Sequence, residues 1–457
     1  MTPQEKPLFD RQALHAGAAK AIDTDGQALL AMRVTRPVEV ASAPAFESRR
    51  ESVETITEAD LIGEPLLAWS DLAGKVVARY FVQNGHEVAL RDDGFRQLRR
   101  LVEKILGTRP FSQGVSENFV EEEVFKWWRA TLRGETEGPL SAHLLDITAS
   151  SVRPHRLLVP LSSIEIERAF ILGDALVTPI DSAMFERMGA KAAAKFPDSA
   201  DQIREACKRM RHELGHLTAV GVEIIGELEF ARDKAREVAF DMASVLRFMS
   251  PAAVSWNITF GCFPHGCDLA PSTTVIEMTD GEISTVSTGM LHSGFFNWKV
   301  PFAELDELMK QGFRNCAAFF EKAPLSEFKQ RVKKAIDAYS QGVASYDTAN
   351  RLIYAMSAAE HLLLRDASEP IQTGVGERMA FLIATEAEDR RATVGNFKKA
   401  YALRSKQVHH LGGVDDEEVL ATFFRNMWVM LFQAMQAMPR FEKHSDFLDA
   451  IDRVKFT

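Results

Sequence analysis

The amino-terminal part of the chain alternates short apolar runs with longer helical patterns. Residues 76–82 form a β-branched and aromatic run, and Asn84-Gly85 follows it as a dipeptide typical of a tight turn between two strands. Residues 117–132 come after Ser116, a favourable N-cap, and carry three early glutamates where the helix dipole favours anions. These patterns predict a mixed α and β fold for residues 1 to about 150.

Between residues 154 and 322 the hydrophobic pattern changes several times. Strand-like runs on either side of Gly173-Asp174 predict a hairpin over about 154–180. From 199 to 249 apolar residues recur at steps of four and three, which predicts one long helix or two consecutive helices with a core-facing stripe. That stripe consists of Ile203, Cys207, Met210, Leu214 and Leu217. Further strands are predicted at 253–260, 273–278 and 284–288, with a helix over about 303–322.

After Pro324 every segment has the pattern of a helix. The predicted helices cover about 326–341, 347–365, 375–388, 391–409, 415–438 and 442–453. Their short connections fit an antiparallel bundle. We therefore expect an α+β amino-terminal region, residues 1–325, with an internal boundary near 150–180, followed by an all-α helical bundle, residues 326–457.

The composition is that of a globular protein, with 46% hydrophobic and 26% charged residues. A net charge of -10 does not favour general nucleic-acid binding, so any contact with RNA must be local. Four cysteines in 457 residues do not make a disulfide framework and suit a reducing compartment. Since neither a signal peptide nor a membrane-spanning run is recognisable, we expect a cytoplasmic protein that does not enter a membrane.

The segment from Val394 to Gly413 carries the strongest candidate chemistry. At about 100° per residue, apolar residues of this helix form a stripe in which Arg404 takes a packing position. A buried guanidinium needs a carboxylate, a polar interface or an anionic ligand. His409 lies about 140° around the helix from Arg404. A helix end at His409 or His410, or a second subunit, would bring the two groups closer.

Arginine and histidine together suit phosphodiester cleavage. An imidazole at a helix carboxy terminus can move the proton of a ribose 2′-hydroxyl or of the leaving oxygen. A guanidinium can stabilise the negatively charged phosphorus centre, so the reaction requires no metal.

Three segments in succession resemble the Apea-like HEPN domain family. They are residues 350–364, residues 376–384 and the stretch Leu403-Arg-Ser-Lys-Gln-Val-His409-His. The resemblance covers about residues 326–457. It implies a helical bundle that dimerises or forms a higher homo-oligomer, and an RNA-cutting effector of bacterial antiviral defence of the abortive-infection type.

By this resemblance Arg404 and His409 match the arginine–histidine motif with four residues between them. His410 matches a longer spacing and stays open as the active histidine. Glu360 matches a recurring acid of the earlier helix and is a candidate partner of Arg404. Ser405 stands where HEPN proteins often have Asn, Asp or His, as expected for the Apea-like branch.

The predicted function is therefore a metal-independent endoribonuclease without a cofactor. In it the 2′-hydroxyl attacks the adjacent phosphate, and the amino-terminal region restrains the bundle until it binds an unknown trigger. The alternative from another class is a non-catalytic dimeric module that binds RNA or protein, because some HEPN domains lack activity.

A second candidate enzyme is a zinc metalloprotease. His212-Glu213-Leu214-Gly215-His216 spells the H-E-x-x-H motif, which on a helix presents two metal ligands and a general base. Both histidines fall opposite the apolar stripe of that helix, and no third ligand is evident, although Glu227 and Glu229 are available.

Two further groups have weaker functional interpretations. Cys262, His265 and Cys267 offer three metal-binding side chains without a second pair, so a strand-to-loop turn is the preferred interpretation. Trp127 and Trp128 stand beside cations and could stack on bases, although such a pair more often belongs to a core. No nucleotide-binding glycine pattern occurs in the chain, so we expect no nucleotide hydrolysis.

Overall fold

The computed structural model describes residues 8–37, 67–267, 272–279, 282–290, 295–366, 368–410 and 416–455. The chain divides into two compact units. Unit 1 comprises Met1–His155 and Glu223–Lys234, and unit 2 comprises Arg156–Val222 and Ala235–Thr457. No helix of the described part has both the length and the apolar character that crossing a membrane requires.

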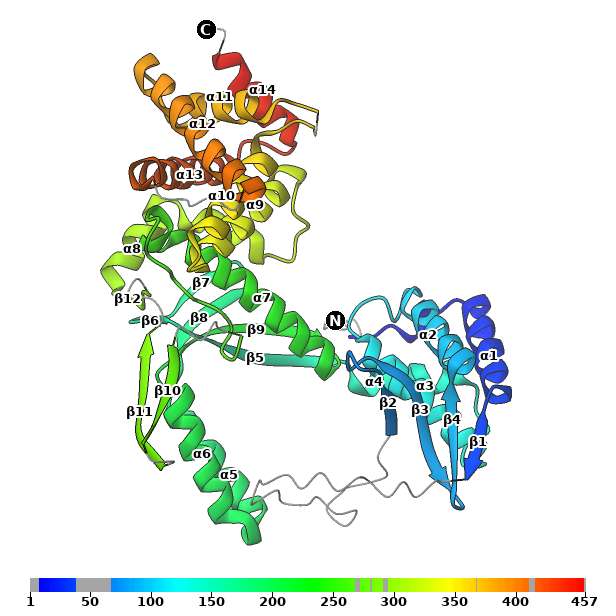
Figure 1. Cartoon of the computed structure of the whole chain (residues 1–457). Helices are drawn as coiled ribbons and strands as arrows, with labels where there is room; N and C mark the ends of the chain where they lie inside the picture. The colour runs from blue at the N-terminus through cyan, green and yellow to red at the C-terminus, as the bar shows by residue number, and fades with distance from the viewer. Residues whose placement is uncertain are drawn as a thin grey trace, which may run out of the picture. The chain divides into compact units, whose positions relative to one another are not determined.

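Unit 1 is an antiparallel sheet with helices packed on one face (Figure 1). Its strands are β1 (Val34–Pro37), β2 (Leu67–Ser70), β3 (Val76–Gln83) and β4 (His86–Arg91), in the order β1-β4-β3-β2. Its helices are α1 (Ala16–Ala31), α2 (Asp92–Leu106), α3 (Glu117–Leu132) and α4 (Leu140–Ser151). The α+β character predicted for this part of the chain is confirmed.

Local signals in unit 1 behave as the sequence predicts. Asn84 and Gly85 both have positive φ, 52° and 71°, which the two-residue turn between β3 and β4 requires. The Ser116 hydroxyl accepts a hydrogen bond from the Phe119 amide at 3.1 Å and caps α3. The sheet face that carries Phe81 packs on α3, where Trp128 lies edge-on to Phe81 at 5.8 Å between ring centroids.

Unit 2 begins with a four-stranded sheet of order β5-β9-β8-β7. The strands of this part of the chain are β5 (Arg153–Leu161), β6 (Ile164–Ile166), β7 (Phe170–Leu172), β8 (Ala175–Pro179), β9 (Thr218–Gly226), β10 (Ser272–Thr279), β11 (Glu282–Met290) and β12 (Trp298–Val300). β12 pairs in parallel with β6, and β10 and β11 form a separate antiparallel hairpin. Helices α5 (Ala183–Lys195) and α6 (Ala200–Leu214) form an arm between β8 and β9 (Figure 1).

The prediction of one long helix or two consecutive helices over 199–249 is wrong in its middle, where a strand lies. The helix α6 ends at Leu214, the strand β9 follows, and α7 (Leu228–Met249) completes the segment. β9 is an inner strand of its sheet, and its sequence Thr-Ala-Val-Gly-Val-Glu-Ile-Ile-Gly is rich in the β-branched residues that favour strands. The predicted core stripe is also only partly buried, because Cys207 alone among its five members is fully covered.

Two other predicted elements differ from the structure. Residues 253–260 form no regular strand: Pro251–Val254 is a short 3₁₀ turn, and Thr259 makes an isolated bridge to Phe295. The helix predicted over 303–322 is interrupted, since α8 (Phe302–Gln311) stops at Gly312, whose φ is 118°. A 3₁₀ segment, Phe313–Phe320, then continues the chain.

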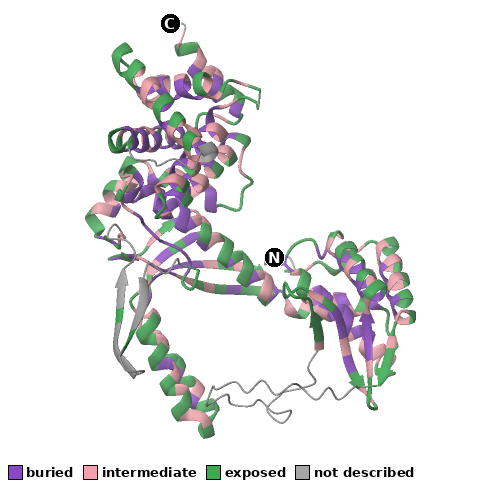
Figure 2. Ribbon diagram, in the orientation of Figure 1, coloured by how far each residue is buried: buried purple, intermediate pink, exposed green. Residues whose placement is uncertain are grey.

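The remainder of the chain is mostly helical, with six helices close to the predicted ones. They are α9 (Glu327–Ala344), α10 (Thr348–Leu363), α11 (Ile371–Ile383), α12 (Ala387–His410), α13 (Glu417–Ala437) and α14 (His444–Val454). Their apolar faces join one hydrophobic core, which also takes in β-strand and 3₁₀ residues before residue 325, among them Trp298 and Phe313 (Figure 2). The helices thus pack directly on the sheet-containing part of unit 2.

Candidate functional site at the seam of two helices

The helix α12 places Arg404 near its carboxy-terminal end. Its middle is fixed by Phe397 and Ala400, both fully buried, and Phe397 lies 6.2 Å from Phe423 of α13 between ring centroids. The helix is described as far as His410, and the end that the following glycines predict is His409 or His410. Arg404 therefore lies on a helix whose position is set by the core.

The guanidinium of Arg404 is half-buried and incompletely bonded. Its Nε atom is shielded from solvent and has no hydrogen-bond partner among the described residues. The ring of Tyr401, one turn earlier, lies 5.9 Å from the Arg404 Cζ atom. A buried guanidinium nitrogen without a hydrogen-bond partner costs free energy, so a partner outside the described residues or a ligand would stabilise it.

Glu360 of α10 is an acidic group that interacts electrostatically with Arg404. Burial raises the pKa of the Glu360 carboxyl, and the positive charge of Arg404 acts in the opposite direction. The Glu360 Oε1 atom is also buried without a hydrogen-bond partner among the described residues. The two groups therefore attract one another across the α10–α12 seam without a hydrogen bond between them. The predicted pairing of Glu360 with Arg404 is present as a charge interaction only.

For the two predicted histidines the structure gives the position of the main chain only. His409 and His410 form the last turn of α12, but their side chains lie outside the described residues. Five residues along a helix separate Arg404 from His409 by about 7.5 Å of rise. Ser405 is half-buried on the same helix.

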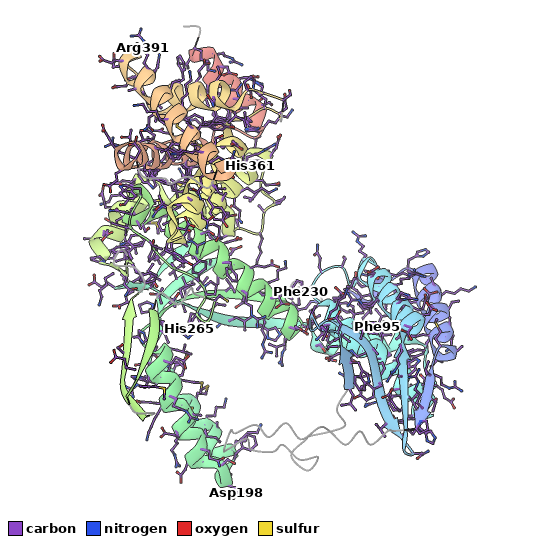
Figure 3. All side chains as sticks on the ribbon, viewed as in Figure 1. Phe95, Asp198, Phe230, His265, His361 and Arg391 are labelled. Carbon is purple, nitrogen blue, oxygen red and sulfur yellow. The ribbon has the colours of Figure 1, made fainter. Side chains whose placement is uncertain are left out.

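The residue after Glu360 belongs to a different, basic group. His361, labelled in Figure 3, lies 3.5 Å from Arg331 of α9 through its Nδ1 atom, and its Nε2 atom is buried without a partner in the described part. Burial, together with Arg331, Lys334 and His444, lowers the pKa of His361. Burial also lowers the pKa of His444, whose Nε2 atom lies 2.7 Å from the Leu362 carbonyl oxygen.

Two buried arginines that the sequence interpretation missed have structural roles. Arg351 of α10 donates hydrogen bonds to the carbonyls of Ala252 and Ile258 at 2.7 and 2.5 Å, and so ties the loop after α7 to the bundle. Arg378 of α11 bonds to Asp452 and Glu369 at 3.0 and 2.8 Å. Both occupy otherwise apolar helix positions, the same signal that identified Arg404, so that signal alone does not separate structure from function.

The H-E-x-x-H motif is not presented by one helix. His212 and Glu213 are in the last turn of α6, but this helix ends at Leu214, before His216. The Glu213 carboxylate instead lies 3.2 Å from the Nε2 atom of His265. No cluster of three or more metal-binding side chains occurs among the described residues. The backbone thus lacks the helical turn that a zinc protease motif needs.

Of the two weaker candidates, the tryptophan pair and Cys262 are packing residues, whereas Cys267 is exposed. Cys262 is buried, and burial raises the pKa of its thiol to about 12, which disfavours the thiolate that a metal would require. Trp127 and Trp128 are buried in unit 1, with their indole nitrogens donating to the Gly138 and Leu29 carbonyls. They form part of the core, the interpretation preferred from sequence.

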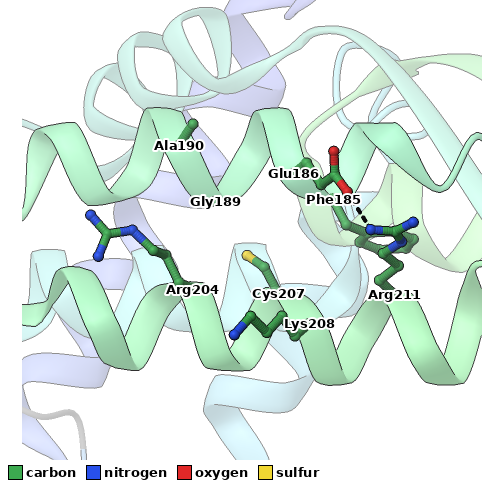
Figure 4. A pocket seen from close by; sticks show the side chains of 8 residues that line it. All are labelled: Phe185, Glu186, Gly189, Ala190, Arg204, Cys207, Lys208 and Arg211. Carbon is green, nitrogen blue, oxygen red and sulfur yellow. Dashed lines mark hydrogen bonds and ion pairs between the residues drawn. The ribbon is translucent and has the colours of Figure 1, made fainter.

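A small groove lies between the helices of the α5–α6 arm, with a volume of about 290 Å³ (Figure 4). Gly189 and Ala190 leave space on the α5 side, and the Cys207 thiol points toward them from α6. Arg211 pairs with Glu186 across the groove. The remaining cations are exposed and pair with carboxylates of their own helix, so the groove contains no catalytic group of charges.

Comparison of the chain with protein-family models, curated proteins and solved structures found no match.

Proposed function

We propose that the helical part is a HEPN-type endoribonuclease that cleaves RNA without a metal ion, with Arg404 and His409 as the catalytic pair and His410 as the alternative histidine. The observation that carries the proposal is the incompletely bonded Arg404 guanidinium, opposite the unpaired Glu360 oxygen, on the helix that ends in the two histidines. Most buried polar atoms of native proteins are hydrogen-bonded, so an unpaired one indicates a ligand, an ion, ordered water or a catalytic role.

In the proposed reaction the 2′-hydroxyl of the RNA attacks the adjacent phosphate and the 5′-oxygen leaves, which produces a 2′,3′-cyclic phosphate end. The imidazole moves the proton, and the guanidinium binds the non-bridging oxygens as negative charge develops there. Glu360 orients Arg404 by charge attraction.

The family resemblance supports the remaining parts of the proposal. Two copies of the chain would pair through their bundles and bring two motifs to one seam, and the amino-terminal part would restrain cleavage until a trigger binds. The biological setting we propose is an antiviral defence of the abortive-infection type in the cytoplasm.

The proposal is tested by incubating purified protein with total RNA and transfer RNA in EDTA. Arg404→Ala and His409→Ala are expected to lower the cleavage rate by about 100-fold or more, because each removes a group that acts in the transition state. A His410→Ala variant shows whether His409 or His410 is the catalytic histidine, since only loss of the catalytic one should slow cleavage. Lys406→Ala, an exposed cation on the same helix, is the matched control and should cleave like the wild type.

Equal cleavage by all variants would contradict the proposed site. Absence of cleavage together with a stable dimer and RNA or protein binding would favour the non-catalytic module instead.

A further inference from the structure

The sheet of unit 1 has one face packed on helices and a second face whose residues lie outside the hydrophobic cluster formed with those helices, although Ala78 and Ala89 on it are buried. Phe81, Val88 and Leu90 belong to the buried cluster with α2 and α3. Because side chains alternate along a strand, Tyr80 and Ala89 point to the opposite face. The register pairs Tyr80 with Ala89 on β4.

Trp69 of the edge strand β2 lies on this second face, opposite Ala78 in the register. Its side chain is 51% exposed, whereas Trp127 and Trp128 of the same unit are 1% and 0% exposed. β2 is mostly exposed along its length (Figure 2). A tryptophan kept in solvent forgoes the large stabilisation that its burial would provide, so its position calls for another explanation.

The exposed indole is part of an ordered aromatic pair. Trp69 and Tyr80 are stacked, with 5.8 Å between ring centroids and 29° between ring planes. The Arg91 Cζ atom lies 5.6 Å from the Trp69 ring centroid. Arg91 is held by Glu87, and its Nε atom is buried without a hydrogen-bond partner in the described part of the chain. Arg36 of β1 stands opposite Glu87 in the register and is exposed.

The turn that follows β2 fixes the position of this pair. The Asp71 carboxylate accepts hydrogen bonds from the Ala73 and Lys75 amides, both at 2.9 Å. Gly74 adopts a φ of 76°, which allows the tight return into β3. The aromatic surface is therefore set by a well-bonded hairpin, and binding would not have to order it.

We infer that the surface formed by Trp69, Tyr80, Arg91 and Arg36 binds single-stranded RNA by stacking its unpaired bases on the two rings. Every base has a flat π-face, and sheet-borne aromatic residues flanked by arginines are suited to it. The arginines attract the phosphates locally, as a chain with a net charge of -10 requires. The inference rests on the proposed function, which identifies RNA as the ligand. It assigns RNA binding to the sheet of unit 1 and RNA cleavage to Arg404 and His409.

The test uses the full chain with Arg404→Ala, so that RNA stays intact during the measurement. Binding of a fluorescein-labelled 12-residue oligouridylate is followed by anisotropy, and tryptophan fluorescence is recorded at the same time. Trp69→Ala should weaken binding by about tenfold or more, the effect typical of losing one stacked base. Trp69→Phe should bind nearly as well but lose the base-induced quenching of tryptophan fluorescence. Ile171→Ala, an exposed apolar residue of unit 2, is the control and should change neither signal.

A second probe of equal length with abasic residues distinguishes bases from phosphates. Weaker binding of the abasic probe supports stacking. Equal binding of both probes, equal binding by Trp69→Ala, or no binding by the chain overturns the inference. The proposed function is judged separately by cleavage in the wild-type background. If cleavage depends on Arg404 and His409 but Trp69→Ala binds RNA like the wild type, the proposed function is supported and the proposed binding surface is contradicted.

Discussion

Two arginines of the helical part show how similar sequence contexts lead to different physical states. Arg378 has its guanidinium fully engaged, with Asp452, Glu369 and the Leu363 carbonyl as acceptors. Arg404 has a shielded Nε atom without an acceptor in the described residues, and its charge opposes the burial that raises the pKa of Glu360, without a hydrogen bond between the two groups. A fully hydrogen-bonded ion-pair network makes a fold more rigid, so we interpret Arg378 as structural. A buried group without a partner is stabilised by binding one, so Arg404 is our candidate for function.

The pKa directions support the same contrast. Burial opposes ionisation of Asp452, but hydrogen bonds from Arg378, Arg365 and Lys455 outweigh it and hold the pKa of this carboxyl far below its usual range. At Glu360 the balance is reversed, because burial outweighs the attraction of Arg404 and raises the pKa. The network around Arg378 thus stabilises the charges that it contains, and the Arg404 seam does not.

Removing Arg378 should have the largest effect on stability. Arg378→Ala leaves Asp452 and Glu369 without their shared cation, and the expected loss is about 3 kcal/mol, the magnitude typical of breaking a buried ion pair. Thermal unfolding followed by circular dichroism should show a Tm lower by at least about 5 °C. Arg404→Ala is the matched comparison and should change the Tm by less than about 2 °C. Similar losses for both variants would end the distinction between them.

Acidification should have an intermediate effect that originates in the basic group beside the seam. The pKa values of His361 and His444 are lowered by burial and by Arg331, so both are neutral when folded at pH 7. As pH falls below the ordinary value of 6.5, the unfolded chain takes up protons that the folded chain resists. The free energy of unfolding should therefore decrease by up to about 1.4 kcal/mol per pH unit for each histidine.

The contribution of one histidine can be isolated by a substitution. His361→Gln should reduce the difference in stability between pH 7 and pH 5, measured by urea unfolding at both values. A dependence on pH that is identical in His361→Gln and wild type would show that this histidine is not buried in the neutral form.

The smallest stability effect is expected at Glu360. Because its pKa is raised, the Glu360 carboxyl contributes stability that is fully present below the ordinary value of 4.5 and is lost as pH rises through the folded pKa. Glu360→Gln removes this loss and should be neutral or stabilising by less than about 1 kcal/mol at pH 7. The same variant should slow RNA cleavage if Glu360 orients Arg404. A clear destabilisation by Glu360→Gln would instead indicate a structural ion pair like that of Arg378.

Much of the fold was accessible from local pattern. The N-cap at Ser116, the turn at Asn84 and Gly85, and six carboxy-terminal helices follow from residue types and periodicity, which act over a few neighbouring positions. The strand β9 was missed because its apolar run continues the spacing of the preceding helix, and only pairing with β5 and β8 makes it extended.

The sequence by itself predicted that Arg404 occupies a packing position on a helix ending at His409 or His410, because helical periodicity is a local property. Only the tertiary structure decided that all three guanidinium nitrogens of Arg378 find acceptors, whereas the Arg404 Nε atom finds none among the described residues, since the acceptors come from segments distant in the chain. The same holds for tryptophan: pattern alone does not distinguish the buried pair on α3 from Trp69, and the packing of helices on one face of the sheet makes the difference.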